Sequence, residues 1–311
     1  MTRQWLRDCR LTVGNGSSAI DLSSMRIRFK VLQDTNQSPN QADITITNLS
    51  DATAEKLMAK EFTQVTLEAG YQGNRGIIFK GTVVQPRRGR ENPTDTYLNL
   101  RCGDGDKGYN FGHVSKTLGA GATPKDIFHA CLQAMQPHGV SLGYLPENFG
   151  GALKYPRAVT MFGMAKGYLR TLAQSFDCQW SIQSGKLDMV PNDGVKPGQA
   201  VVLNTATGLI GMPEETTDGI YVRCLINPAI RVNTLLQIDQ SLINRAALDL
   251  SNSGYPTSNK LLGQTGVKDG TYRVLAVDWE GDTRGPEWYC DIVCIGVTGS
   301  VSDGQKALGR G

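Results

Sequence analysis

The stretch Met25-Arg26-Ile27-Arg28-Phe29-Lys30-Val31 alternates apolar and basic side chains from one residue to the next. The stretch Ala42-Asp43-Ile44-Thr45-Ile46-Thr47-Asn48 alternates in the same way, with acidic and hydroxyl side chains between the apolar ones. A period of two places successive side chains on opposite faces of a β-strand, so each stretch predicts a strand with one buried and one wet face. Such half-buried strands are typical of antiparallel sheets.

The sequence around these two stretches continues the β pattern with one interruption. Residues 52–58 change to helical spacing, and Ser50 or Asp51 can cap a short helix there. Several short strands in about a hundred residues favour a small barrel or sandwich over a parallel α/β sheet. The other strands predicted in this region are residues 11–13, 62–69, 76–84 and 97–102, with a turn at 70–75 and a longer loop at 86–95.

The middle of the chain has a different pattern. Thr123-Pro124 predicts a capped helix that ends before Pro137, and a second helix is predicted from 163 to 176. Ser184-Gly185 predicts the turn of a hairpin. Strands return after residue 200, and a stretch rich in Ser, Gly, Asn and Pro at 251–268 predicts a long loop.

We therefore expect an α+β, mainly β protein in which two similar antiparallel β-barrel domains flank an α/β domain. The first barrel domain spans residues 1–113, the α/β domain 114–199 and the second barrel domain 200–300. Residues 301–311 are expected to form a flexible tail.

A weak internal repeat connects the two β-rich regions. Residues 79–84 precede a loop with arginine and glycine, after which Tyr97 is followed five residues on by Cys102. Residues 272–277 precede a similar loop, and Tyr289 is again followed five residues on by Cys294. The alternative, that any two antiparallel hairpins look alike, has equal weight because alternation is generic to such sheets.

Composition excludes several classes of protein. The 311 residues carry a formal charge of only +3, whereas nucleic-acid-binding domains usually concentrate basic residues. The amino terminus has no apolar leader and no apolar run approaches the length of a membrane span, so we expect synthesis and folding in a cytosol. Seven cysteines in mostly apolar, strand-like segments favour buried free thiols over disulfides.

Motifs that carry chemistry are weak. Residues 103–109 begin like a calcium loop but lack its later ligands, which favours a strand-ending turn. Residues 119–124 lack the Gly-Lys-Ser/Thr of a phosphate-binding loop, which favours a capped helix entry. His113 or His129 could pair with Cys102 or Cys131, but packed or surface histidines are more common. We expect no catalytic residue, no cofactor and no metal site.

The one dense basic run is Arg87-Arg88-Gly89-Arg90 in the loop 86–95. Three arginines could meet phosphates, but Glu91 and Asp95 follow at once. This mixture favours a solvated hairpin loop or a contact to a partner protein over DNA readout.

One region resembles a known family. Thr207-Gly208-Leu209-Ile210-Gly211-Met212-Pro213 precedes a predicted strand from Asp218 and then Leu225-Ile226-Asn227-Pro228. This pattern, the strand ending in Asn48-Leu49 and the hairpin 180–190 resemble baseplate hub proteins of contractile-tailed bacteriophages. The resemblance covers most of the chain, from about residue 25 to 296.

The resemblance implies a non-enzymatic virion protein of the tail baseplate, made in the cytoplasm of the host bacterium. It implies a homotrimer around a channel, in which three chains with two barrels each adapt a sixfold tail tube or distal tube ring to a threefold central spike. The tape-measure protein and later the genome would occupy the lumen, without specific DNA binding or membrane insertion. Candidate subunit or tube contacts are Arg87, Arg88, Arg90, Leu209, Ile210 and Met212, although residues 208–213 could equally be a tight domain crossover.

Two other functions remain open. Glu214, Glu215 and Asp218 would be the acidic residues of a tail-tip hydrolase that degrades the cell wall. Four tryptophans are the only feature of a receptor- or carbohydrate-binding β module, and tryptophans spread along a chain more often fill cores.

Overall fold

The computed structural model describes residues 4, 6–15, 18–59, 63–216, 219–239, 243 and 270–297. The predicted loop at 251–268 and the tail at 301–311 lie outside these residues. The described chain is mainly β with four α-helices, which confirms the predicted α+β, mainly β class.

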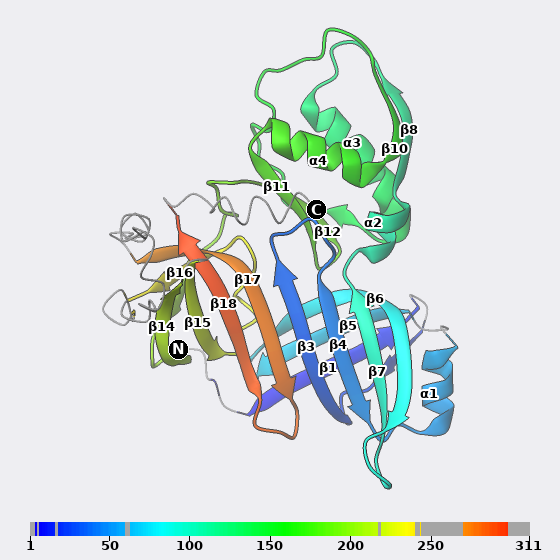
Figure 1. Ribbon diagram of the computed structural model, residues 1–311, viewed down its shortest axis with the longest axis vertical. Coiled ribbons are helices and arrows are strands. Elements are labelled where there is room, and N and C mark those ends of the chain that lie inside the picture. The colour runs from blue at the N-terminus through cyan, green and yellow to red at the C-terminus, as the bar shows by residue number, and fades with distance from the viewer. Residues whose placement is uncertain are drawn as a thin grey trace, which may run out of the picture.

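Strands from both β-rich regions belong to one sheet (Figure 1). Among the described residues its order is β14-β15-β18-β17-β3-β4-β7-β6-β5-β1-β2, with β16 paired to β17 and β13 paired to β16. The first region contributes β1 (Arg7–Gly14), β2 (Ala19–Asp21), β3 (Arg26–Asp34), β4 (Gln41–Thr47), β5 (Gln64–Tyr71), β6 (Asn74–Arg90) and β7 (Thr96–Gly103), with helix α1 (Asp51–Met58) after β4. The second contributes β13 (Val201–Leu203), β14 (Leu209–Thr216), β15 (Gly219–Leu225), β16 (Leu235–Ile238), β17 (Thr271–Asp282) and β18 (Trp288–Gly296).

The two β regions meet where β17 pairs antiparallel with β3, with Trp279 opposite Val31. Side chains from both regions form one apolar core. Its buried tryptophans find polar partners across the junction: Trp279 Nε1 donates to Gln33 Oε1 at 3.0 Å, and Trp288 Nε1 donates to the Gly70 carbonyl at 3.2 Å. The expected pair of separate closed barrels is not confirmed, because the strand path over the described residues ends at β14 and β2, which do not pair with each other.

The middle region has its own core and lies beside one end of the large sheet (Figure 1). Helix α3 starts with a capping box between Thr123 and Asp126, as predicted from Thr123-Pro124. Strands β8 and β10 form a two-stranded ribbon, so the helix predicted from residue 163 instead begins at Ala165. The elements are α2 (Asp106–Phe111), β8 (His113–Leu118), α3 (Pro124–Met135), the 3₁₀ helix η1 (Gln136–His138), β9 (Ser141–Leu142), β10 (Val159–Met164), α4 (Ala165–Ser175), β11 (Cys178–Gln183) and β12 (Lys186–Pro191).

A buried carboxylate joins the middle region to the sheet. Asp104, directly after β7, is fully buried and accepts hydrogen bonds from the Ser184 and Gly185 backbone N–H groups at 2.5 and 2.7 Å. These residues form the predicted turn between β11 and β12. Asn40 Nδ2 adds a hydrogen bond to the Ile182 carbonyl at 3.1 Å. Desolvation raises the pKa of Asp104 to about 7, against the opposing effect of its hydrogen bonds.

The remaining composition-based predictions concern thiols, aromatic residues and membranes. All seven cysteines are free, five buried and two partly buried. Trp180, Trp279 and Trp288 are buried, whereas Trp5 lies outside the described residues. Within the part of the chain that the structure describes, no helix combines the length and apolarity that a membrane span needs.

Candidate assembly surfaces

The large sheet contains the same strand arrangement twice. In the first β region, β3 pairs with β4, β4 pairs with β7, and β7 pairs with β6, so the last two strands exchange places relative to their order along the chain. The order β14-β15-β18-β17 follows the same rule. We call these four-stranded arrangements the first and second units. They lie in tandem, because β17 of the second unit pairs with β3 of the first.

The two units also share a β-bulge at the same place. Val83 lies opposite Cys102, and the next pair is Gln85 with Arg101, so Val84 is the extra residue. In the second unit Val274 lies opposite Cys294, and the next pair joins Ala276 to Val293. A bulge bends its strand and increases the local twist, so the two units are bent at corresponding positions. The stretches 97–102 and 289–294 of the weak sequence repeat coincide in this register, whereas the stretches 79–84 and 272–277 are offset by two residues.

The first predicted contact segment is a strand for half its length. The sequence predicted a loop over 86–95, but β6 continues to Arg90 and the loop itself comprises only 91–95. The alternation was hidden because Pro86 and three arginines occupy a paired strand. Arg87, Arg88 and Arg90 are all exposed, and Arg88 forms an ion pair with Asp51 at the start of α1.

The tip of this hairpin is held in one conformation by hydrogen bonds. Asn92 Oδ1 accepts from the Asp95 backbone N–H at 2.7 Å, and Asn48 Nδ2 donates to Asp95 Oδ1 at 2.8 Å. The bonds from Asn48 and Asn92 hold the pKa of Asp95 below its ordinary value. Arg28 binds Glu91 with both guanidinium Nη atoms, at 2.9 and 2.8 Å. A tip ordered in this way can present a defined surface without a large ordering cost.

The second predicted contact segment, residues 208–213, lies mostly in edge strand β14 and not in a turn. A bulge between Ile210 and Glu214, with Gly211 at φ 71°, breaks the alternation that would have indicated a strand. Leu209 was expected to contact a partner, but it is buried in the core and is not available at the surface. Ile210 and Met212 are 37% and 62% exposed. Among the described residues β14 pairs with β15 alone, so its outer edge is open.

The acidic residues considered for hydrolysis do not face each other. Glu214 and Glu215 are successive residues of β14 and therefore point to opposite faces of the strand. Asp218 lies outside the described residues. Within those residues there is also no group of three or more His, Cys, Asp or Glu side chains that could hold a metal ion.

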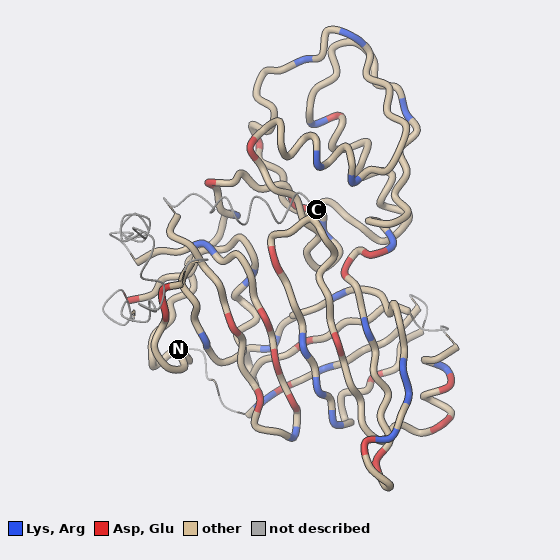
Figure 2. Tube along the Cα trace, in the orientation of Figure 1, with Lys and Arg blue, Asp and Glu red and all other residues tan. Residues whose placement is uncertain are grey.

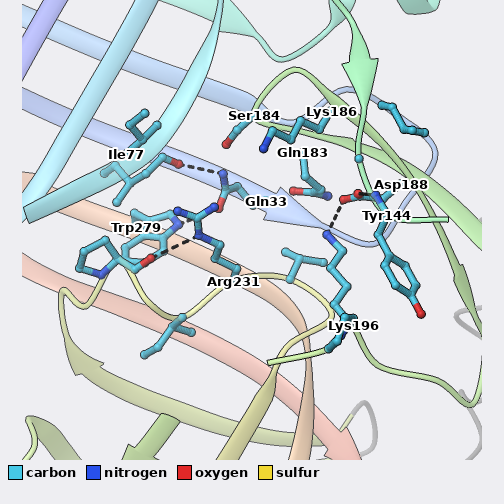
Figure 3. A pocket seen from close by; sticks show the side chains of 17 residues that line it. Gln33, Ile77, Tyr144, Gln183, Ser184, Lys186, Asp188, Lys196, Arg231 and Trp279 are labelled. Carbon is cyan, nitrogen blue, oxygen red and sulfur yellow. Dashed lines mark hydrogen bonds and ion pairs between the residues drawn. The ribbon is translucent and has the colours of Figure 1, made fainter. Parts of the chain in front are cut away.

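A cavity of about 340 Å³ lies where the two β regions and the middle region meet (Figure 3). The Asp188 carboxylate there forms an ion pair with Lys196 and accepts from the Tyr144 backbone N–H at 2.6 Å. Arg231 donates weakly from Nε to the Pro228 carbonyl at 3.5 Å. These contacts connect the segments around the cavity and do not place a nucleophile beside a base.

Charged residues of both signs are mixed over the strands of the sheet (Figure 2). Several form ion pairs between neighbouring strands, such as Arg223 with Asp291 at 2.7 Å and Arg26 with Asp282 at 2.6 Å. This mixed surface differs from the concentrated basic surface that binds phosphate backbones.

Known proteins share this fold. The 43 kDa tail protein of prophage MuSo2 from Shewanella oneidensis is 8% identical with a TM-score of 0.57, over 94% of this chain and 97% of that one. A tail protein from Neisseria meningitidis MC58 is 10% identical with a TM-score of 0.57 over the same shares. The E. coli c3393 protein is a type VI secretion component described as structurally similar to T4 tail proteins gp27 and gp5. It is 8% identical with a TM-score of 0.56, over 89% of this chain and 76% of that one.

No curated protein matches the sequence of this chain. At identities of 8 to 10% the structural likenesses show the fold alone. A family model described as Baseplate hub gp41 matches residues 8–250, which is most of the chain. The chain therefore belongs to the baseplate hub gp41 family and is a structural component of a phage tail baseplate.

Proposed function

We propose that this baseplate hub protein is a homotrimer that surrounds the tail lumen and adapts a sixfold tail tube to a threefold central spike. The observation that carries the proposal is the tandem repeat of strand order and bulge within one sheet. Three chains with two such units each present six similar units to a sixfold partner, yet they remain threefold toward the spike.

A symmetry change between two rings has to be accommodated by some component. Closed rings of identical chains give identical interfaces, so a trimer alone would offer only three equivalent sites. Two units in one chain double that number, while the middle region remains present once per chain. In this proposal the two units face the tube or distal tube ring, and the middle region gives the assembly its threefold character. The three-part division at residues 113, 199 and 300 belongs to this proposal.

The lumen would hold the tape-measure protein and later let the genome pass. A conduit of this kind must not retain DNA, and clustered cations would retain it through counterion release. The formal charge of +3 and the mixture of both signs over the strands fit a lumen of low affinity for DNA.

Light scattering after size-exclusion chromatography tests the stoichiometry. We expect a particle of three times the chain mass of 33.7 kDa. Electron microscopy of tails should then show a threefold ring between tube and spike, with six similar lobes toward the tube. A monomer at all concentrations and in tails, or a ring with another number of chains, contradicts the proposal.

A further inference from the structure

We infer that copies of this chain join edge to edge, with the distal half of β6 in one copy paired antiparallel to β14 of the next copy. The inferred junction repeats between copies the β17–β3 junction found within each chain. It rests on the proposed homotrimer and names the residues that hold it together.

The junction within the chain shows what each unit requires of its neighbour. Strand β17 pairs with β18 along one side. On its other side it pairs with β16 before the bulge, through residues 271–273, and with β3 after the bulge, through residues 276–282. Strand β17 thus has a neighbouring strand on both sides along nearly all of its length.

Strand β6 is the counterpart of β17, but among the described residues it has no partner strand after the bulge on the side away from β7. It pairs with β7 along one side and with β5 before the bulge, up to Thr82. After the bulge, residues 85–90 pair with β7 alone among the described residues. At the other end of the sheet β14, the counterpart of β3, pairs with β15 alone within the part of the chain that the structure describes. The described residues therefore leave open one edge of each kind that the internal junction joins.

The repeat also predicts the register between copies. Aligning Cys102 with Cys294 across the units makes Arg88 the counterpart of Trp279. Aligning β14 with β3 through their partners β15 and β4 makes Glu215 the counterpart of Val31. Because Trp279 lies opposite Val31 within the chain, Arg88 of one copy is placed opposite Glu215 of the next.

This register brings opposite charges together. Arg88 and Glu215 become a direct cross-strand pair. Glu214 falls opposite Gly89, which has no side chain, and lies diagonal to Arg87, within reach of a long side chain. The internal junction has an opposite-charge pair of its own, because Glu280 lies opposite Lys30. By contrast, two β6 edges would bring arginines together and two β14 edges would bring glutamates together.

Two local features limit the junction to a short ladder. Pro86 and Pro213 each lack a backbone N–H, and proline in an edge strand faces its nitrogen toward the open side. Main-chain pairing is then confined to residues 87–90 against 213–216. Helix α1 packs on the core face, since Leu57 belongs to the core, and Arg88 contacts it through Asp51. The ladder is short enough to be reversible and gains its specificity from the charges.

Cysteine cross-linking tests the register directly in the full-length protein. The double variant Arg88→Cys with Glu215→Cys should form intermolecular disulfides on mild oxidation, giving covalent dimers and trimers on a non-reducing gel. Each single variant and the wild type, whose native thiols are mostly buried, should give at least about tenfold less. Peptide mass spectrometry should identify the 88–215 link.

Charge exchange gives a second measurement. Arg87→Glu with Arg88→Glu should raise the concentration at which trimers dissociate by about 2- to 25-fold, since each of the two opposite-charge contacts strengthens association by up to about fivefold. Glu214→Lys with Glu215→Lys should do the same, and combining all four changes should restore association. The matched control, Arg157→Glu with Glu147→Lys on the middle region, should leave it unchanged.

The outcomes separate the two claims. If the wild type is a trimer but the double-cysteine variant forms no 88–215 link, or the combined charge exchange does not restore association, this junction is wrong and the proposed hub function stays intact. A wild type that is monomeric alone and in tails overturns both.

Discussion

Asp104 makes the contact between the sheet and the middle region sensitive to pH. Its side chain is 0% exposed, and desolvation raises its pKa from an ordinary 3.8 to about 7. Between these two pH values the folded protein keeps a proton that the unfolded chain has released. The stability that this proton contributes is fully present below about pH 4 and is lost as the pH rises to about 7.

The magnitude follows from the size of the shift. A shift of one pKa unit corresponds to 1.36 kcal/mol, so a rise of about three units lowers the free energy of unfolding by about 4 kcal/mol across this range. Asp104→Asn removes the titration but keeps one acceptor for the Ser184–Gly185 turn. Its amide NH₂ then faces a backbone N–H, which costs about 1–3 kcal/mol at pH 4. We therefore expect the variant to be less stable than wild type at pH 4 and to match or exceed it at pH 7.5.

Urea unfolding followed by tryptophan fluorescence at several pH values between 4 and 7.5 measures this difference. Taking the difference between variant and wild type cancels the titration of other groups. Glu147→Gln, an exposed position in the same region, should follow the wild type at every pH. A gap between wild type and Asp104→Asn that stays constant or widens with pH refutes the reasoning, because the two N–H donors would then hold Asp104 ionised in the folded protein.

Three further substitutions test other parts of the fold. Thr123→Ala removes the cap of α3 and should cost about 1 kcal/mol of stability, measured by urea unfolding. Trp279→Phe leaves Gln33 Oε1 without its buried donor. In the same measurement it should lower the free energy of unfolding by about 1–3 kcal/mol, and the smaller side chain should lower it further. Met212→Glu changes an exposed side chain on β14, so the free energy of unfolding should change by no more than about 0.5 kcal/mol in the same measurement.

Strands with strict alternation could be predicted from the sequence, whereas the bulged strand β14 could not. The stretch around Phe29 has a period of two over its whole length and forms β3 as predicted. In β14 the bulge after Ile210 shifts the register, so the alternation is lost and a turn was the natural interpretation. Asp104 could not be identified as a junction residue, because its partners at Ser184 and Gly185 are eighty residues away in the sequence. Sequence spacing contains no information about such a contact.

The open edges explain why an assembly of this chain should close instead of growing without limit or aggregating. An unpaired strand edge is a general aggregation risk, and proline or charge on the edge reduces it. Here each edge carries a proline, and the two edges carry opposite charges, so an edge repels its own kind and accepts only the other. That rule makes every contact between copies head-to-tail, and a head-to-tail contact forms a ring when its rotation closes and a filament when it does not. The matched bulges bear on which outcome occurs, because they bend both units at corresponding positions. If the turn per unit within the chain is repeated between chains, deleting the bulge residue Val84 should convert closed trimers into open or larger assemblies, which mass measurement by light scattering would detect.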